Sequence, residues 1–185
     1  MQSASPKGGK ESVIVVMGVC GAGKSRLALN LSDRLGVGMV EADDFHTLEN
    51  KQKMAKGEAL TDADRMPWLD AVAMAALLQL YCTGGAVVAC SSLKRTYRDR
   101  LRNSLPGCSF VHLDGSRALI ADRLINRQDH FAGETLLDSQ LAILEPLDDD
   151  ETGFTLQISR PVDQLVDGAL EGLRRIAPPQ TTVAN

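Results

Sequence analysis

Several features that would assign this chain to a common class of protein are missing from its sequence. No run of about 18 apolar residues occurs, the length that a membrane-spanning helix needs. Residues 1–12 contain lysines but no apolar stretch of the kind found in secretory signals. Positive charge is not in excess, because Asp and Glu outnumber Lys and Arg by 24 to 20 and the net charge is −4. We therefore expect no membrane partner and no general nucleic-acid surface.

Cysteine is also scarce, and its spacing indicates neither disulfide nor zinc chemistry. The four cysteines are Cys20, Cys82, Cys90 and Cys108, and no two of them form a C-x-x-C pair. A reducing, cytoplasmic compartment is the simplest interpretation. Cys20 lies in a glycine-rich stretch, where a small filler side chain and a redox-active thiol are both open alternatives.

What the sequence does contain is typical of one globular domain. The 185 residues are 44% hydrophobic and 24% charged, with no internal repeat, low-complexity block or interdomain linker. We expect a single domain over residues 13–176. Residues 1–12 and 177–185 are interpreted as a disordered N-terminal extension and a flexible tail.

Residues 18–25 carry the clearest motif, because they match G-x-x-x-x-G-K-[ST] in full. An apolar run precedes the motif, and leucines at four-residue spacing follow it, which predicts a strand, a glycine loop and a helix. Backbone N–H groups in such a loop bind phosphate oxygens, and the helix N-terminus adds partial positive charge. Lys24 is expected to reach the β- and γ-phosphates of ATP, and Ser25 to bind Mg²⁺. The predicted phosphate-binding residues are Gly18, Val19, Cys20, Gly21, Ala22, Gly23, Lys24, Ser25 and Arg26.

Strand and helix patterns alternate along the whole chain, which predicts an α/β fold. We expect the P-loop NTP hydrolase fold, with a five-stranded parallel sheet covered by helices on both faces. The predicted strands lie near 13–17, 38–41, 86–90, 109–113 and 154–158. The predicted helices lie near 24–35, 48–56, 67–82, 93–105, 116–127, 134–144 and 162–176. For the third helix, Asp62 or Asp64 is expected to be the cap, Pro67 to occupy the first turn, and the run Thr83-Gly84-Gly85 to end it.

Ligands of open parallel sheets gather beyond the C-terminal ends of the strands, so the residues there are candidates for binding a phosphate acceptor. Asp43 is the first choice for a general base that orients or deprotonates an attacking hydroxyl. Glu41 is expected to hold Mg²⁺ through a water, because the third strand ends in Cys90 and Ser91 rather than in Asp. His46 is an acceptor ligand or a packed loop residue. Candidate acceptor ligands are Asp43, His46, Arg65, Ser91, Lys94 and Arg98. Lys94 and Arg98 fall at four-residue spacing on one helical face, for which a solvated surface is the open alternative.

Positive charge is also expected over the transferring phosphoryl group. Arg123 and Arg127 share one helical face, and a polar break follows them near Gly133. A pair of arginines at the base of a small helical lid, over about residues 123–135, can supply that charge. The alternative is that both are surface residues paired with Asp122 or Asp129. Adenine contacts are expected near Arg127 and around residues 159–161.

Several longer blocks are more specific than the phosphate loop. Residues 60–69 contain Asp-Arg-x-Pro-Trp-Leu, residues 90–99 contain Cys-Ser-x-Leu-Lys-x-x-Tyr-Arg-Asp, and residues 42–46 read Ala-Asp-Asp-Phe-His. With these blocks the chain resembles gluconokinases of the phosphate-loop type, which are related to shikimate kinase and, more distantly, to nucleoside monophosphate kinases. The resemblance runs from about residue 13 to 146.

The resemblance implies ATP-dependent phosphorylation of D-gluconate at its 6-hydroxyl, with Mg²⁺, by a homodimer that serves carbohydrate acid catabolism and the pentose phosphate pathway. It also implies that Asp43 activates that hydroxyl and that Arg65 meets the carboxylate end of the acceptor, helped by His46, Lys94 and Arg98. Lys24, Asp43 and Arg123 are then the catalytic residues.

The sequence departs from the family pattern at a few positions. Glu41 stands where the family usually has Asp, and Thr47 and Ala59 stand where it usually has Pro, so a looser acceptor loop is expected. A kinase for another small acid such as shikimate, a nucleoside monophosphate kinase and a nucleotide-binding regulatory protein stay as alternatives. The block at 60–69 counts against shikimate kinase.

Overall fold

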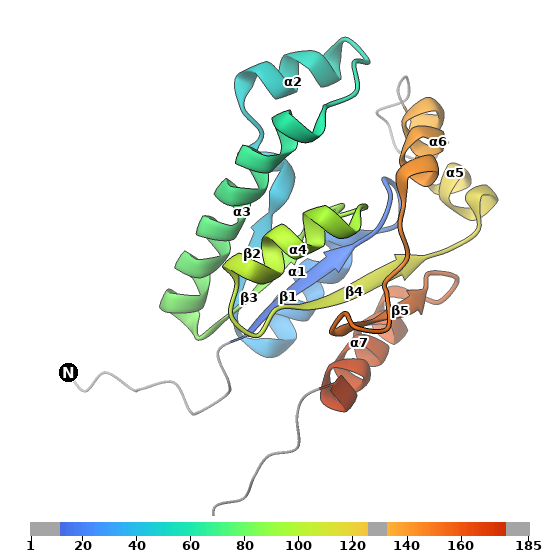
Figure 1. Cartoon of the computed structure of the whole chain (residues 1–185). Coiled ribbons are helices and arrows are strands. Elements are labelled where there is room, and N and C mark those ends of the chain that lie inside the picture. The colour runs from blue at the N-terminus through green and yellow to red at the C-terminus, as the bar shows by residue number, and fades with distance from the viewer. Residues whose placement is uncertain (1–11, 126–132, 177–185) are drawn as a thin grey trace, which may run out of the picture.

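A five-stranded parallel sheet forms the centre of the protein. The computed structural model describes residues 12–125 and 133–176 (Figure 1). The strands are β1 (Ser12–Met17), β2 (Gly38–Glu41), β3 (Gly85–Ala89), β4 (Ser109–Asp114) and β5 (Gly153–Gln157), in the order β2-β3-β1-β4-β5. Every neighbouring pair is parallel. β1, β3 and β4 are almost wholly buried, and β1 and β3 are also largely apolar, as expected for inner strands covered on both faces. The predicted fold is therefore confirmed.

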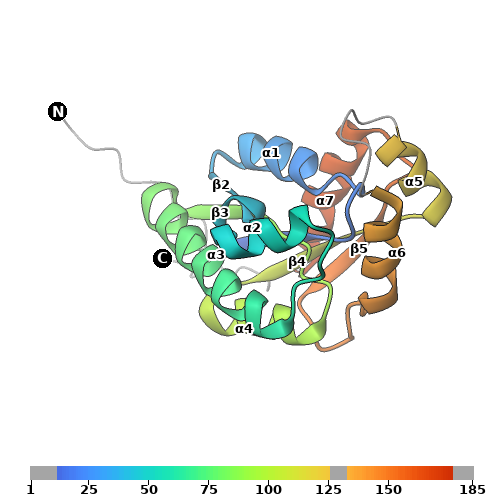
Figure 2. The same cartoon turned by 90° about the horizontal axis from the view of Figure 1, so that it is seen from above.

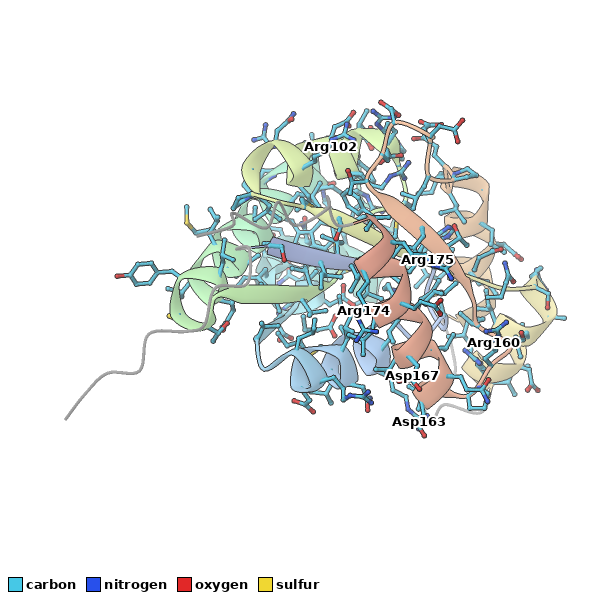
Figure 3. The ribbon with its side chains drawn as sticks, turned by 90° about the horizontal axis from the view of Figure 1, so that it is seen from below. Arg102, Arg160, Asp163, Asp167, Arg174 and Arg175 are labelled. Carbon is cyan, nitrogen blue, oxygen red and sulfur yellow. The ribbon has the colours of Figure 1, made fainter. Side chains whose placement is uncertain are left out.

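Helices cover both faces of this sheet (Figures 1 and 2). They are α1 (Lys24–Leu35), α2 (Leu48–Ala55), α3 (Asp62–Thr83), α4 (Arg95–Ser104), α5 (Arg117–Ile125), α6 (Gly133–Ile143) and α7 (Val162–Ile176), with a short 3₁₀ helix η1 (Ala42–Phe45). One hydrophobic cluster joins the sheet to α3 and α4, and a second joins its other face to α1, α5 and α7. Asp163, Asp167 and Arg174 lie on the outer side of α7 (Figure 3). No helix among residues 12–125 and 133–176 is long and apolar enough to cross a membrane.

The start of α3 differs from the predicted one. The helix begins at Asp62 rather than near Pro67, and Thr61 is its N-cap. The Thr61 side chain accepts a hydrogen bond from the Asp64 N–H, and the Asp64 carboxylate accepts one from the Thr61 N–H. This capping box satisfies two N–H groups and starts the helix early. Pro67 is consequently inside the helix, and Gly84 ends it at φ 81°, as predicted.

The predicted chain ends and lid fall partly beyond the described residues. Ser12, which was assigned to the N-terminal extension, is the first residue of β1. Residues 1–11 and 177–185 lie outside the described part of the chain. The predicted lid begins in α5 and ends in α6, and its residues 126–132, including Arg127, also lie outside that part.

Candidate active site

The phosphate loop occupies the C-terminal end of β1 and leads directly into α1. Gly18, Gly21 and Gly23 have φ values of 138°, 77° and 100°, which favour glycine. Gly18 also passes so close to β4 that a Cβ atom would lie 2.7 Å from the Leu113 carbonyl oxygen. The Gly18 N–H donates to the Ser91 carbonyl at 3.2 Å, which ties the loop to the end of β3. The sequence therefore folds these residues into the strand–loop–helix arrangement of a phosphate cradle.

Lys24 lies at the start of α1 and turns back over the loop. Its ammonium donates to the Val19 carbonyl at 3.0 Å. Burial lowers the pKa of Lys24, while the negative charges of Asp43 and Glu41 act in the opposite direction. The structure thus brings the predicted phosphate-binding lysine and the predicted base to the same end of the site.

Ser25 and Glu41 form a pair of hard oxygen donors beside Lys24. The Glu41 carboxylate lies at the end of β2, where burial raises its pKa and a hydrogen bond with Ser25 lowers it. Mg²⁺ prefers oxygen ligands and keeps several of its waters, so it is held by few protein groups together with phosphate oxygens. A serine hydroxyl next to a carboxylate fits that requirement.

Two helices hold the loop from its outer side (Figure 2). Arg123 of α5 donates to the Ala22 carbonyl at 3.4 Å and to the Ile158 carbonyl, beyond β5, at 2.6 Å. Gln140 of α6 accepts a hydrogen bond from the Cys20 N–H at 2.6 Å. Gly21 packs against Ile120 and Leu124 of α5 so closely that a Cβ atom would collide with Leu124. The loop is therefore fixed by contacts that need no bound nucleotide.

A pocket of about 470 Å³ opens beside the loop between α1, α5 and the start of α7. Arg26, Arg123, Arg160 and Pro161 line it together with apolar residues of α1 and α7. Figure 3 shows Arg160 near the end of α7 that carries Asp163. A lining that combines apolar side chains with arginines suits a nucleotide base and its phosphates. Arg160 and Pro161 lie in the predicted adenine loop.

On the other side of Lys24, η1 carries the predicted acceptor residue Asp43, and the second one, His46, follows η1 directly as its C-cap. Trp68 of α3 holds this segment, because its indole N–H donates to the Ala42 carbonyl at 2.7 Å and its ring stacks on His46 at 4.3 Å. The His46 Nε2 atom lies 3.9 Å from the Asp43 carboxylate, which is 80% exposed. Burial lowers the pKa of His46, so the ring is neutral near pH 7. Asp43 is therefore presented to solvent from a fixed backbone.

Arg65 and Lys94 meet around the ring of Tyr97. The Arg65 guanidinium lies 5.8 Å from the ring centre, and the Lys94 ammonium lies 5.5 Å from it. Asp62 accepts hydrogen bonds from Lys94 at 2.9 Å and from the Tyr97 hydroxyl at 2.5 Å. These hydrogen bonds lower the pKa of the Asp62 carboxyl, which stays ionised at neutral pH. Two of the predicted acceptor cations thus lie around the same ring, and one of them, Lys94, is paired with the Asp62 carboxylate.

Arg98 does not belong to the acceptor site, contrary to the prediction. Its side chain is fully buried, and its guanidinium donates to both carboxylate oxygens of Glu151 at 2.7 Å. Its remaining donors are taken by four backbone carbonyls, those of Ser92, Leu93, Glu145 and Pro146. No N–H is left for a ligand, so Arg98 instead fastens α4 to the segment before β5. Four-residue spacing from Lys94 suggested a shared exposed face, but α4 begins only at Arg95 and buries Arg98.

Four residues at the site were missed. Trp68 is buried, and its hydrogen bond to η1 was not predicted. Asp62 and Tyr97 lie within the specific sequence blocks, and that is the only signal that could have identified them. Gln140 lies more than 100 residues from the loop that it contacts, so only the tertiary fold reveals it.

The loop, the sheet order and the flanking helices define a class of protein. A family model described as "AAA domain" matches residues 13–147. The fold is shared with shikimate kinase from Acinetobacter baumannii, at a TM-score of 0.60 and 15% identity, over 91% of this chain and 96% of that one. The protein is a P-loop kinase in fold, within the AAA-domain family.

Similarity to other proteins narrows the class further. A gluconokinase from Gluconobacter oxydans is 46% identical over 77% of this chain and 80% of its own length. The thermoresistant gluconokinase of Escherichia coli is 35% identical over 88% of this chain and 94% of its own length. The crystal structure of a gluconokinase from Sinorhizobium meliloti superposes with a TM-score of 0.81 at 40% identity, covering 91% of this chain and 94% of that one. The chain belongs to the gluconokinase family.

Proposed function

We propose that this enzyme transfers the γ-phosphoryl group of ATP to the 6-hydroxyl of D-gluconate and releases 6-phospho-D-gluconate and ADP. Membership of the gluconokinase family supports ATP-dependent phosphorylation of gluconate. The observation that carries the proposal is the position of Asp43, which lies near Lys24 of the phosphate loop while the cations Arg65 and Lys94 lie together around Tyr97. Arg65 and Lys94 can thus bind the carboxylate at one end of an acidic polyol while a hydroxyl at its other end lies at Asp43.

On the nucleotide side, the loop N–H groups and Lys24 hold the phosphates, and the pocket lined by Arg26 and Arg123 receives the adenosine part. Arg127 is proposed as a second cation from the lid. Ser25 would hold Mg²⁺ directly and Glu41 would hold it through a water. Bound there, the ion would neutralise charge on the β- and γ-phosphates.

On the acceptor side, Asp43 accepts the hydrogen bond of the 6-hydroxyl and takes its proton as the new P–O bond forms and the bond to ADP breaks. The neutral ring of His46 and Ser91, which lies two residues after β3, are proposed to bind hydroxyls, and Arg65 and Lys94 to bind the carboxylate. Most of the catalysis then comes from positioning and charge stabilisation.

Product analysis tests this function. The enzyme is incubated with ATP, Mg²⁺ and either D-gluconate, shikimate, AMP or no acceptor, and the products are identified by ³¹P and ¹³C NMR. A phosphate ester on C6 of gluconate alone is the expected result. Ester formation on shikimate, ADP formed from AMP, or ADP without any phosphorylated acceptor would contradict the proposal.

We further propose a cytoplasmic homodimer that pairs through the outer face of α3 and supplies phosphorylated sugar acid to the pentose phosphate pathway. α3 is apolar on both of its faces, although only one packs on the sheet. On the outer face Met74, Leu78 and Tyr81 are 68%, 61% and 90% exposed. A contiguous apolar face of this kind is typical of a protein interface. Leu78→Glu should give a monomer in light scattering, whereas Leu29→Glu on α1 should leave the dimer intact.

A further inference from the structure

Gln140 contacts the phosphate loop from a rigid position. It lies on α6, which is anchored by Leu137, a fully buried residue, and by Leu141 and Ile143, which pack on the hydrophobic cluster beneath α1 and α5. Its side-chain carbonyl Oε1 accepts the Cys20 N–H at 2.6 Å. A side chain held by a packed helix and by a hydrogen bond is placed accurately enough to take part in a binding site.

The contact lies at the end of the loop where the γ-phosphate is expected. Burial raises the pKa of the Cys20 thiol, and the nearby Lys24 ammonium acts in the opposite direction. The negative charge of Asp43 likewise acts on Lys24 and favours its charged form. The pocket proposed for the adenosine part is lined by Gly21, Gly23 and Arg26 but not by Cys20. Gln140 therefore approaches the loop near the γ-phosphate end.

The hydrogen bond also fixes which way the amide group points its donors. Because Oε1 is the acceptor for Cys20, the two N–H groups of Nε2 occupy the other branch of the amide. Within residues 12–125 and 133–176 no other hydrogen bond is recorded for the Gln140 side chain. A neutral amide donor beside a phosphate cradle can bind a phosphoryl oxygen without the large desolvation cost of a cation.

We propose that Gln140 is a further phosphate-binding residue of the phosphoryl-transfer site: its Oε1 positions the loop through Cys20, and its Nε2 donates a hydrogen bond to an oxygen of the γ-phosphoryl group. The proposal rests on the proposed use of ATP. It assigns to α6 a direct role in recognising the transferable phosphate, so the site distinguishes ATP from ADP partly through this residue.

Nucleotide binding without any acceptor tests the proposal, with calorimetric affinities for ADP and for a non-hydrolysable ATP analogue in the presence of Mg²⁺. Gln140→Leu removes both the acceptor and the donor. Gln140→Glu retains the acceptor for Cys20, removes the donor and adds negative charge. Ser139→Ala, which removes only an exposed hydroxyl bonded within α6, is the matched control. Thermal melting of each variant reports separately on folding.

The expected result is a loss of preference for the ATP analogue over ADP, by about tenfold in Gln140→Leu and by more in Gln140→Glu. Gln140→Glu should have the same melting temperature as the wild type, and Ser139→Ala should match the wild type in every measurement. Equal weakening of both nucleotides in Gln140→Leu, restored in Gln140→Glu, would overturn the proposal and leave Gln140 as a support of the loop. Because no acceptor is present, failure of the gluconate assignment would appear only in the product analysis.

Discussion

The two halves of the site differ in how far they are built before a ligand arrives. On the nucleotide side, the loop is tied to β3, α5 and α6 by hydrogen bonds to its own backbone, and its glycines pack against Leu113 and Leu124. On the acceptor side, Asp43 is 80% exposed. Lys94 there is paired with Asp62, whose side chain is 56% exposed. The nucleotide half is preorganised, whereas in the acceptor half Lys94 must exchange the Asp62 carboxylate for that of the substrate.

This difference has a physical consequence for the reaction. A preorganised loop has already lost its conformational freedom, so binding of phosphate does not have to offset that cost. The exposed pair of Lys94 and Asp62 is weak in water and can be replaced by a substrate carboxylate at low cost. We therefore expect changes in the nucleotide half to reduce turnover, and changes at the acceptor cations Arg65 and Lys94 to weaken gluconate binding.

The largest effect is expected beneath the acceptor half, at the buried pair of Arg98 and Glu151. Arg98→Met leaves the buried Glu151 carboxylate with only the Asp148 N–H and the more distant Arg95 guanidinium, at 3.9 Å, as partners, which should lower the free energy of unfolding by about 3 kcal/mol. Arg100→Met on the same helix removes an exposed pair with Asp70 and should cost about 0–1 kcal/mol. Urea unfolding of the two variants makes the comparison, and equal losses would show that the burial of Arg98 is not decisive.

The next effect concerns the nucleotide half. Lys24→Met removes the cation at the phosphate loop and should lower kcat by about 10²–10³-fold, because charge on the transferring phosphate is no longer stabilised. Arg34→Met, which removes an exposed arginine from the same helix, is the control. Steady-state kinetics measure both. A change confined to the KM for gluconate would contradict the expectation that the nucleotide half determines turnover and the acceptor cations determine gluconate binding.

A smaller and more selective effect is expected at Arg65. Arg65→Met removes a cation proposed to bind the acceptor carboxylate, so the KM for D-gluconate should rise by about tenfold or more while the KM for ATP is unchanged. Arg102→Met, on the far part of α4, should alter neither constant. An equal rise in both KM values would show that Arg65 supports the structure of the whole site and does not bind the acceptor specifically.

The smallest effect is expected where α3 begins. Thr61→Ala removes the N-cap and should lower the free energy of unfolding by about 1 kcal/mol.

The Lys53 ammonium and hydrogen bonds with Thr61 lower the pKa of Asp64 to about 2. Because this folded-state pKa lies below the ordinary value of 3.8 for an aspartate, the unfolded chain binds the proton more tightly. Stability from Asp64 is therefore complete above about pH 4 and is lost as the pH falls toward 2. Urea unfolding of Asp64→Asn should lack that dependence.

Local sequence patterns predicted most of the fold, because each strand and helix has its own signal. Apolar runs identified β1 and β3, and the glycine loop identified the start of α1. The beginning of α3 was placed too late because Pro67 suggested a first turn, whereas the reciprocal bonds of Thr61 and Asp64 decide where the helix starts.

The candidate site was less predictable, because it depends on contacts between distant parts of the chain. Helical spacing placed Arg98 beside Lys94, but only the packing of α4 against the segment before β5 shows that Arg98 is buried. Spacing could not show that Asp62 lies between Lys94 and Tyr97, or that Gln140 reaches Cys20. Motifs predict residue types at strand ends, whereas pairing between them follows from the tertiary fold.

The most direct test of the account is gluconate-dependent ADP release by the wild type, Asp43→Asn and Asp44→Asn. Both substitutions remove one charge from η1, but only Asp43 is proposed to meet the acceptor hydroxyl. The account predicts ADP release that requires gluconate, is largely lost in Asp43→Asn and is retained in Asp44→Asn. ADP release that ignores gluconate, or equal activity of the two variants, would contradict it.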